Sequence, residues 1–197
     1  MMVRLNSLAQ AQANTGPQFD CGELAWLPRL GAFRVRPLRA ADHRAYRAFG
    51  ARLDPDDLRL RFARPVKLDS PVLHAQFRDI DHDRVEVFAA FDAAGAILGV
   101  ARFVRTSPAS AEIALIVRSD LKRRGLGRVL LDRLLWHACL LGLAELTGQV
   151  LYENRAMLRL AAQAGFRVIG GSGVMADLRK DIRSLPTAAV CHAAGAH

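Results

Sequence analysis

Cysteine, tyrosine and tryptophan are scarce in this 197-residue chain, which contains three, two and two of them. The three cysteines, Cys21, Cys139 and Cys191, lie far apart and include no CxxC pair, so neither a disulfide framework nor a zinc site is indicated. No stretch approaches the roughly 20 apolar residues that a membrane helix needs, and residues 1–19 are too polar for a signal-peptide core. We therefore expect a cytoplasmic protein with no metal and no membrane partner.

Acidic residues are outnumbered, because 28 lysines and arginines occur with 19 aspartates and glutamates, which gives a formal net charge of +9. Such a chain attracts anions, and these include nucleic acids, membrane surfaces, acidic proteins and phosphate-bearing cofactors. The basic residues are spread along the chain, few tyrosines and tryptophans are available to stack on bases, and no nucleic-acid-binding motif occurs. A nucleic-acid-binding module is therefore disfavoured, although charge alone does not choose among the anions.

One folded domain is expected at residues 32–182, because 197 residues supply one sizeable core. Residues 1–31 are predicted to form an N-terminal arm, and the alanine-rich residues 183–197 a flexible C-terminal tail. Strands are expected at 33–37, 85–91, 97–104, 111–117, 145–151, 166–169 and 174–178, and helices at 40–53, after Asp54, and at 71–77, 125–141 and 155–164. Strands alternate with helices in the second half, so we predict a mixed α/β sheet.

Four basic residues crowd the start of the helix expected at 125–141, namely Lys122, Arg123, Arg124 and Arg128. Cations are repelled there, because the helix dipole and the unpaired N–H groups already make the potential positive. A polyanion would reverse this, since Gly125 and Gly127 let the backbone approach closely and several N–H groups can point at one phosphate. Neither a Rossmann nor a Walker pattern is present. A phosphate cradle is the hypothesis, and an ordinary helix start with surface arginines is the alternative.

Residues 111–127 resemble the strand, loop and helix that form the acetyl-CoA site of the GNAT superfamily of N-acetyltransferases, whose loop has the pattern Gln/Arg-x-x-Gly-x-Gly/Ala. Lys122 occupies the first motif position, where it keeps the charge but not the planar, multi-donor head of arginine. Asn154 and the Gly-Phe pair at 165–166 resemble the family's strand-to-helix turn and the start of its next strand. The resemblance covers about residues 33–178 and implies an α/β (α+β) GNAT fold, with a mixed central sheet of about six to seven strands and helices on both faces.

Three shorter segments, 35–38, 58–62 and 81–84, together with the strand that contains Glu112, resemble more closely the acetyltransferase domain of bacterial protein lysine acetyltransferases. The family resemblance implies acetyl-CoA as the cofactor, held along the strand and in the loop. The implied contacts are Leu115, Ile116, Val117, Lys122, Arg123, Arg124, Gly125, Leu126, Gly127, Arg128 and Asn154. A backbone N–H near Ile116 or Val117 would then stabilise the thioester oxyanion.

A general base is needed for acetyl transfer, because a free lysine has a pKa of about 10.4 and is mostly protonated at neutral pH. Glu112 is the only ionisable residue of the strand expected at 111–117, and it shares a face with Ala114 and Ile116. Partial desolvation on that face would make it a stronger base, acting directly or through water, and the alternative is a carboxylate at a solvated strand edge. In the resembling protein acetyltransferases a glutamate at this position is the proposed base, which favours catalysis. The family's tyrosine acid falls on Ala161, so no general acid is assigned.

The sequence therefore predicts an acetyl-CoA-dependent N-acetyltransferase that acts on a primary amine, with a lysine side chain of a protein such as a metabolic enzyme as the favoured acceptor. A small-amine acetyltransferase, a non-catalytic acyl-CoA sensor and a basic nucleic-acid-binding module stay open. A monomer and a homodimer are both compatible with the sequence. The charged segment 81–84 is either part of the substrate entrance or an ordinary loop.

Overall fold

A mixed sheet of eight strands organises the residues that the computed structural model describes, which are 23–67 and 79–183. The strands are β1 (Glu23–Leu27), β2 (Gly31–Pro37), β3 (Val85–Phe91), β4 (Ile97–Ser107), β5 (Ser110–Val117), β6 (Glu145–Leu151), β7 (Arg167–Ser172) and β8 (Met175–Asp181). Their order is β1-β2-β3-β4-β5-β6-β8-β7, and every neighbouring pair except β5–β6 is antiparallel. The predicted mixed α/β sheet is confirmed, with eight strands instead of six to seven.

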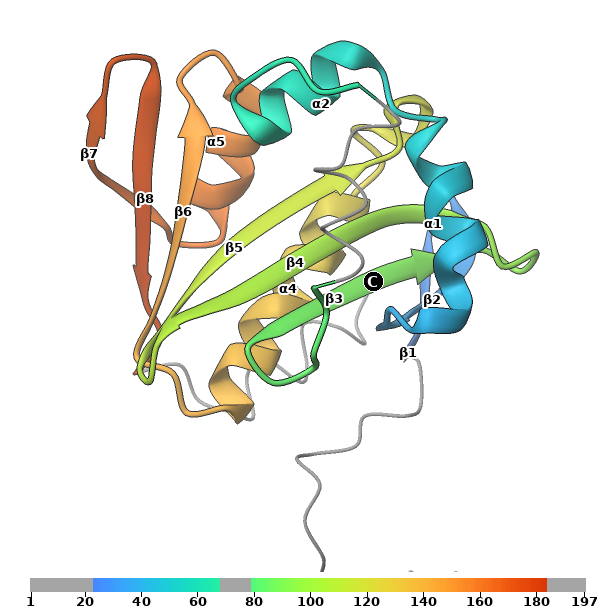
Figure 1. The fold of residues 1–197 in the computed structure, drawn as a ribbon, viewed down its shortest axis with the longest axis horizontal. Helices are drawn as coiled ribbons and strands as arrows, with labels where there is room; N and C mark the ends of the chain where they lie inside the picture. The colour runs from blue at the N-terminus through green and yellow to red at the C-terminus, as the bar shows by residue number, and fades with distance from the viewer. Residues whose placement is uncertain (1–22, 68–78, 184–197) are drawn as a thin grey trace, which may run out of the picture.

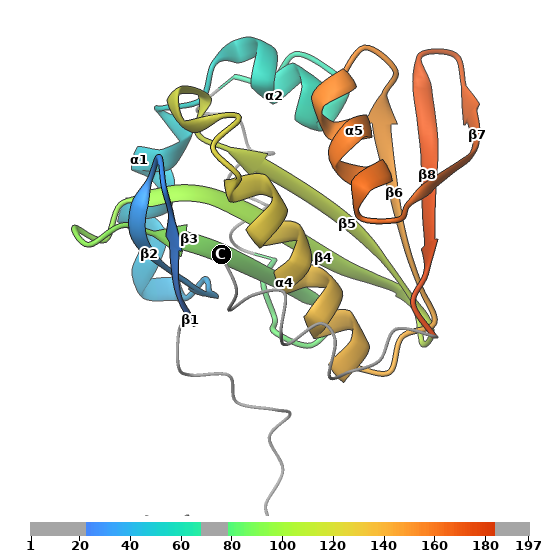
Figure 2. The same ribbon diagram turned by 180° about the vertical axis from the view of Figure 1, so that it is seen from behind.

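Helices cover both faces of the sheet, as predicted (Figure 1 and Figure 2). The α-helices are α1 (His43–Gly50), α2 (Pro55–Phe62), α4 (Leu126–Leu140) and α5 (Arg155–Gln163), and two 3-10 turns span Ala40–Asp42 and Ser119–Leu121. On one face α4 lies across β3, β4 and β5, with α5 beside it, and on the other face lie α1 and α2. The helix expected at 71–77 lies outside the described residues.

Strand alternation divides the apolar side chains between two cores. Phe88 and Phe103 point to the face covered by α4, where they join Leu130 in the larger core. Val87 points to the opposite face and packs in the smaller core with Leu58 of α2. Full burial of one side chain of this size contributes about 1.5–3 kcal/mol. Helices therefore pack on both faces of the sheet, and the packed sheet positions the loops at the ends of its strands.

The parallel pair β5–β6 is joined at one end only. Its register runs from Ser110 opposite Glu145 to Glu112 opposite Thr147, and beyond these residues the two strands part (Figure 1). From Ile113 onwards β5 pairs with β4 alone, so the other edge of its backbone has no strand partner among the described residues. Helix α2 contacts both strands and lies over the opening between them.

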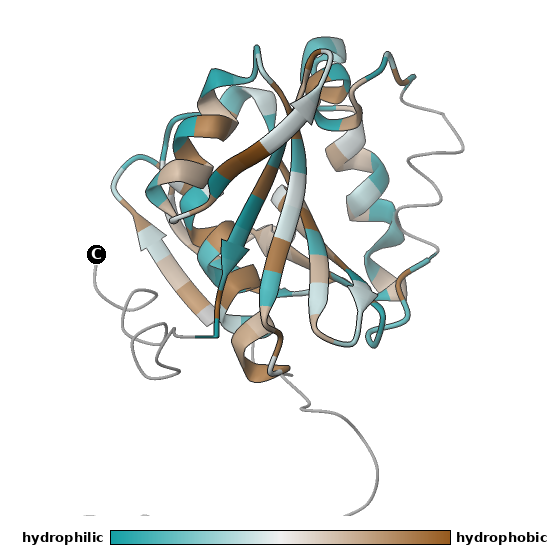
Figure 3. Cartoon of the chain, turned by 90° about the vertical axis from the view of Figure 1, so that its left-hand side faces the viewer, coloured by the Kyte–Doolittle hydropathy of each residue, from teal (hydrophilic) through white to brown (hydrophobic). Residues whose placement is uncertain are grey.

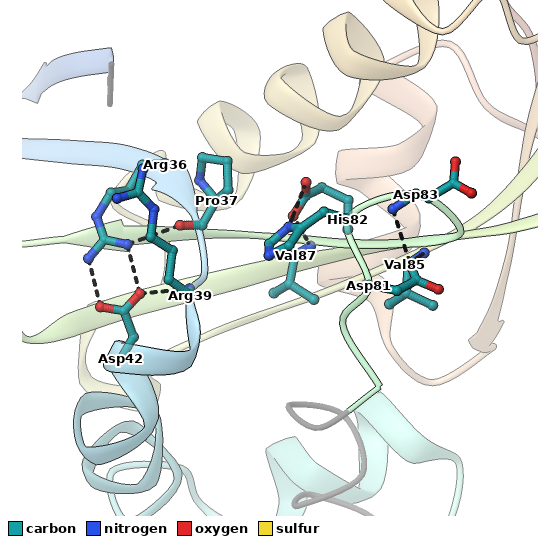
Figure 4. A network of polar contacts seen from close by, with 10 residues as sticks. Arg36, Pro37, Arg39, Asp42, Asp81, His82, Asp83, Val85 and Val87 are labelled. Atoms are coloured by element: carbon teal, nitrogen blue, oxygen red, sulfur yellow. Dashed lines mark hydrogen bonds and ion pairs between the residues drawn. The ribbon is translucent and has the colours of Figure 1, made fainter. Parts of the chain in front are cut away.

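An arginine–aspartate pair fixes the start of α1 (Figure 4). The guanidinium of Arg36, in β2, donates to both carboxylate oxygens of Asp42 at 2.7 Å each, and the backbone N–H of Arg39 donates to the same carboxylate at 2.8 Å. The hydrogen bonds from Arg36 lower the pKa of Asp42. With Asp42 held in this way, the chain forms a 3-10 turn first, and the α-helix begins at His43 rather than at residue 40.

Both edges of the sheet expose apolar side chains. At β1, Leu24 and Trp26 are exposed on the side turned away from the larger core. At the opposite edge, which faces the viewer in Figure 3, Val168 and Ile169 of β7 are exposed. Edge strands present unpaired backbone groups, so these two edges, like the free edge of β5, are open to further pairing.

Strand β1 falls inside the segment 1–31, which is predicted as an arm, and it pairs with β2 along its whole length. The sheet therefore begins earlier than the sequence indicates. Residues 1–22 and 184–197 lie outside the described residues, so the domain limits at 32–182 and the character of the arm and the tail stay predictions.

Candidate functional site

The loop between β5 and α4 alternates between two backbone regions. Lys122 is extended, Arg123 is left-handed with a φ of 59°, and Gly125 is left-handed with a φ of 92°. For a residue with a side chain such as Arg123, the left-handed region costs about 1–2 kcal/mol. Strain of this kind concentrates at ligand-binding loops, and alternation of handedness turns successive N–H groups to one side.

Three N–H groups at the start of α4 have no hydrogen-bond acceptor among the described residues. The first helical hydrogen bonds run from Arg128 and Val129 to the carbonyl oxygen of Gly125, at 2.9 and 3.3 Å. The N–H groups of Gly125, Leu126 and Gly127 donate to no group within residues 23–67 and 79–183. They lie at the positive end of a 15-residue helix, which is the arrangement that binds phosphate groups.

The two glycines of the loop leave little room for a side chain. A Cβ atom on Gly125 would lie 3.2 Å from Cδ2 of Leu27, and one on Gly127 would lie 3.3 Å from Cδ2 of Leu160. Gly125 also has the positive φ that favours glycine. The glycine spacing is therefore required by backbone shape and by close packing against β1 and α5, which bring the loop to its position.

Lys122 points away from this loop, toward α2. Its ammonium group pairs with the carboxylate of Asp57, which is only 6% exposed. The hydroxyl of Ser119 donates to the same carboxylate at 2.6 Å and accepts from the backbone N–H of Asp54 at 2.8 Å. The lysine that replaces the family's glutamine or arginine is thus used to join the loop to α2, and its predicted contact with a cofactor stays a prediction.

Arg124 and Arg128 are also engaged with the protein. Arg124 donates to the carbonyl oxygens of Arg29 and Asp120, at 3.0 and 3.1 Å, and Arg128 pairs with Asp132 at 2.8 Å. These side chains brace the loop and the first turns of α4. Three of the four basic side chains singled out from the sequence are thus engaged with the protein, so an anion at this loop would meet chiefly the backbone N–H groups.

The two faces of β5 carry the other predicted site residues. Leu115 and Val117 point toward α4, and each approaches within 3.9 Å of a Cβ placed on Gly127. Ile116 points to the opposite face and packs in the smaller core, and Glu112 lies on that face as well. The strand therefore links the anion-binding loop at its C-terminal end to the predicted base near its N-terminal end.

Glu112 is exposed, so the predicted desolvation of its carboxylate is not a feature of this structure. Two arginines act on it electrostatically, Arg61 from α2 and Arg102 from β4. Burial lowers the pKa of Arg61 to about 10, and burial also lowers the pKa of Arg102 and raises that of the neighbouring Tyr46. An exposed carboxylate can still take a proton through a water molecule.

Arg61, Arg102 and Tyr46 were not predicted as site residues from the sequence. The signal that could have found one of them is the single arginine inside the apolar run Ile97–Val104, because an arginine on a mostly buried strand needs a polar environment. The other two come from separate helices, and only the fold brings them to β5.

Asn154 is the N-cap residue of α5. Its side-chain oxygen accepts from the backbone N–H of Met157 at 3.1 Å, which caps the helix. Ala161, where the family's tyrosine is expected, is buried, and Tyr152 is exposed on the preceding turn. The contact of Asn154 with a cofactor stays a prediction, and no general acid is found among these residues.

The charged segment 81–84 is held by its own hydrogen bonds (Figure 4). The carboxylate of Asp81 accepts from the N–H of Val85 at 2.7 Å, and Nδ1 of His82 lies 3.1 Å from the carboxylate of Glu86. His82 is left-handed, with a φ of 60°. These contacts shape the turn into β3, which favours the ordinary-loop interpretation of this segment.

Residues 23–67 and 79–183 contain neither a membrane-spanning helix nor a cluster of metal-ligating side chains. No helix there is both long enough and apolar enough to cross a membrane. Within the same ranges, no group of three or more histidine, cysteine, aspartate or glutamate side chains is arranged to hold a metal ion. The metal-free site stays a prediction.

Known proteins resemble this chain in sequence across the site. Residues 33–167 match the family described as the acetyltransferase (GNAT) domain, a range that contains β5, the loop and the whole of α4. An acetyltransferase of Pseudomonas aeruginosa is 31% identical over 136 residues, which are 67% of this chain and 73% of that protein.

Solved structures resemble it in fold. The GNAT domain of S. lividans PAT has a TM-score of 0.74 at 23% identity, covering 81% of this chain and 96% of that one. The ribosomal-protein-S5-alanine acetyltransferase from Vibrio fischeri has a TM-score of 0.65 at 14% identity, covering 78% and 95%. The spermidine N-acetyltransferase from Vibrio cholerae, in complex with CoA and spermine, has a TM-score of 0.62 at 19% identity, covering 76% and 95%. At these identities the likeness concerns the fold alone.

Proposed function

The chain belongs to the GNAT family of N-acetyltransferases, and on this premise we propose that it transfers the acetyl group of acetyl-CoA to a primary amine, with a protein lysine side chain as the acceptor. The family uses acetyl-CoA. The observation that carries the proposal is the start of α4, where the N–H groups of Gly125, Leu126 and Gly127 are open to a ligand at the positive end of the helix. A pyrophosphate is the part of acetyl-CoA that suits them.

The donor extends from this loop along β5 in the proposal. The edge of β5 beyond Ile113 has no strand partner among the described residues, so its backbone groups are available to the amides of a pantetheine arm. Val117 and Glu112 are five positions apart along β5, which is roughly 17 Å at about 3.3–3.4 Å per residue. An extended arm running along this edge brings the thioester toward Glu112.

The reaction follows from the groups at that end of β5. Glu112 accepts a proton from the acceptor ammonium through a water molecule, because its carboxylate is exposed. The neutral amine attacks the thioester carbonyl, the new C–N bond forms, and the oxyanion accepts a hydrogen bond from a backbone N–H on the free edge of β5. The C–S bond then breaks, and the departing thiolate takes a proton from solvent or from the amine that has become acylated.

The protein lysine acceptor is supported by the segments 35–38, 58–62 and 81–84, which resemble bacterial protein lysine acetyltransferases. A small amine is the second candidate, because the spermidine N-acetyltransferase from Vibrio cholerae has the same fold. A non-catalytic acyl-CoA sensor would use the same loop but would not need Glu112. We also propose the cytoplasm as the location, and a monomer or a homodimer as the working form.

The experiment that tests the proposal is a thiol-release assay with acetyl-CoA and a panel of acyl-CoA synthetases, histone-like proteins and polyamines. We expect CoA release that depends on a protein in the panel, with acetyl-lysine found in that protein by mass spectrometry. Release with polyamines alone would replace the protein acceptor by a small amine. Tight binding of acetyl-CoA with no release in the presence of any amine would indicate a sensor and contradict the proposal.

A further inference from the structure

Helix α2 is held over the opening between β5 and β6 by contacts at both sides. On the side of β5, the buried carboxylate of Asp57 binds the hydroxyl of Ser119 and the ammonium group of Lys122. On the side of β6, the guanidinium of Arg59 pairs with Glu153 in the turn after the strand. The position of α2 above β5 is therefore set by its own ion pairs.

Arg61 lies on α2 one turn after Asp57, and so faces the same way, toward β5. It is half-buried, and its guanidinium carbon lies 4.8 Å from the centroid of the Phe62 ring. It forms no ion pair with any residue of 23–67 or 79–183. A guanidinium withdrawn from water without a carboxylate partner is unfavourable, which indicates a place for an anion.

The second arginine on this face, Arg102, has more carboxylates in its surroundings than Arg61 has. In the antiparallel pair of β4 and β5, Arg102 lies opposite Ala114, and Glu112 lies opposite Val104, so Arg102 and Glu112 are diagonal neighbours on one face. Arg102 also has Asp79 and Asp81 within electrostatic reach.

The groups that act on Arg61 are fewer. They are the phenol of Tyr46, Arg102 and Glu112, and of these only Glu112 is anionic. When Glu112 accepts a proton from an incoming amine, its carboxylate becomes neutral. No other anionic group among the described residues then acts on the positive charge of Arg61. The face thus presents one negative and one positive group that interact electrostatically.

We infer that the acceptor carries a carboxylate close to its reacting amine, and that Arg61 binds this carboxylate while Glu112 receives the amine. The inference rests on the proposed acetyl transfer and specifies its substrate. An ammonium group suits Glu112, a carboxylate suits the fork of a guanidinium, and an acceptor bearing both groups meets both charges at once. A polyamine, which carries cations only, would place a positive charge against Arg61.

Two sources can supply the same carboxylate. One is the free carboxylate of an amino acid, and the other is an aspartate or glutamate side chain next to a lysine in a protein. The test therefore uses two pairs of acceptors that differ only in this group. The first pair is Nα-acetyl-lysine and its carboxamide, and the second is a capped peptide with Asp-Lys and its twin with Asn-Lys.

The experiment measures kcat/KM for these four acceptors with the full chain and with Arg61→Gln, Arg61→Lys and the control Arg64→Gln, which changes an exposed arginine just after α2. For the unchanged protein we expect the carboxylate member of one pair to be favoured about tenfold or more over its amide twin. Arg61→Gln should bring that ratio close to one by raising KM for the carboxylate acceptor. Arg61→Lys should restore part of the ratio, and Arg64→Gln should leave it unchanged.

The pair that shows the preference identifies the source, a free amino acid or an acidic neighbour in a protein. Equal rates for both twins, or a ratio that survives in Arg61→Gln, would overturn the inference and leave acetyl transfer intact. A rise in KM for acetyl-CoA alone would assign Arg61 to the donor and overturn it as well. If none of the four amines is acetylated, the proposed lysine acceptor fails, and calorimetry on the CoA-loaded protein decides the inference, which requires tighter binding of the carboxylate twin.

Discussion

At the C-terminal end of β5 the groups open to a ligand belong to the backbone, whereas at its N-terminal end they are side chains from three different elements. The loop before α4 offers the N–H groups of consecutive residues, and most of its basic side chains are bound to other parts of the protein. Around Glu112, by contrast, Arg61 and Arg102 come from α2 and β4. One strand thus joins a site made by local geometry to a site made by long-range packing.

This difference accords with the two roles that we propose. The donor end has to recognise one feature, a pyrophosphate, and a backbone cradle does this independently of side-chain identity. The acceptor end has to choose among amines, and specificity of that kind resides in variable side chains on separate elements. Substitutions at the two ends should therefore have different kinetic signatures.

The largest effect should come from Glu112→Gln. Without a base, kcat should fall by about 10²–10⁴-fold, while the Kd for acetyl-CoA, measured by calorimetry, should change little because the loop is untouched. This would separate the two ends of β5 cleanly. A parent-like kcat in the variant would remove Glu112 from its role.

Lowering the pH should destabilise the whole fold, and with it both ends of β5, through His137 in α4. Burial lowers the pKa of His137 from 6.5 to about 4, helped by Arg133 and Arg105. Below pH 6.5 the unfolded chain therefore binds a proton that the folded chain refuses, so stability is full above this pH and falls by on the order of 3 kcal/mol as the pH drops toward 4.

Urea unfolding of the parent and of His137→Phe over pH 7 to 4 measures this loss. The phenylalanine should fit between Phe88 and Phe103, whose rings contact the histidine edge-on, and should remove the contribution of residue 137 to the pH dependence. The same pH dependence in both proteins would show that His137 is not its source.

The donor end alone should be damaged by valine at Gly125 or Gly127. Both substitutions meet neighbouring leucines at less than 3.4 Å, and we expect the Kd for acetyl-CoA to rise by about tenfold or more, measured by calorimetry. Gly142→Val is the matched control, because Gly142 also has a positive φ but open space around it. It should cost about 1–2 kcal/mol of stability without weakening binding. Equal losses of affinity in all three variants would contradict the cradle.

The smallest effect should come from Asp57→Asn. This substitution weakens the contact by which α2 connects the loop before α4 with the surroundings of Glu112. It weakens the pair with Lys122, so α2 should be held less firmly and KM for both substrates should rise a few-fold, with a loss of about 1–3 kcal/mol in the free energy of unfolding. Asp56→Asn, at an exposed position, is the control and should change neither. An effect on only one substrate would show that α2 does not couple the ends.

The donor end could be predicted from the sequence because its determinants are consecutive. Basic residues, glycines and a following apolar helix occur within a few positions, so Gly125 and Gly127 are found where the pattern places them, at the start of α4. The hairpin of β3 and β4 was predicted for the same reason, since the turn at 92–95 lies between two apolar runs. Local geometry of this kind is encoded within a short window.

Apart from Glu112, the acceptor end could not be predicted, because its members are distant in the chain. Arg61 comes from α2 and Arg102 from β4, and neither sequence window indicates the other or Glu112. Strand β1 was missed although Ala25 and Leu27 alternate with the exposed Leu24, since five residues between breakers are a weak signal until β2 pairs with them. Contacts between residues that are distant in the chain are the feature that a single sequence indicates least.

The most direct test of the central claim is a titration of the ¹⁵N-labelled protein with CoA, followed through the amide resonances. We predict that the largest shifts fall on Gly125, Leu126 and Gly127, and that the exposed Gly142, beyond the opposite end of the 15-residue helix α4, does not move. Tight binding of CoA with unmoved resonances at these three amides would contradict it.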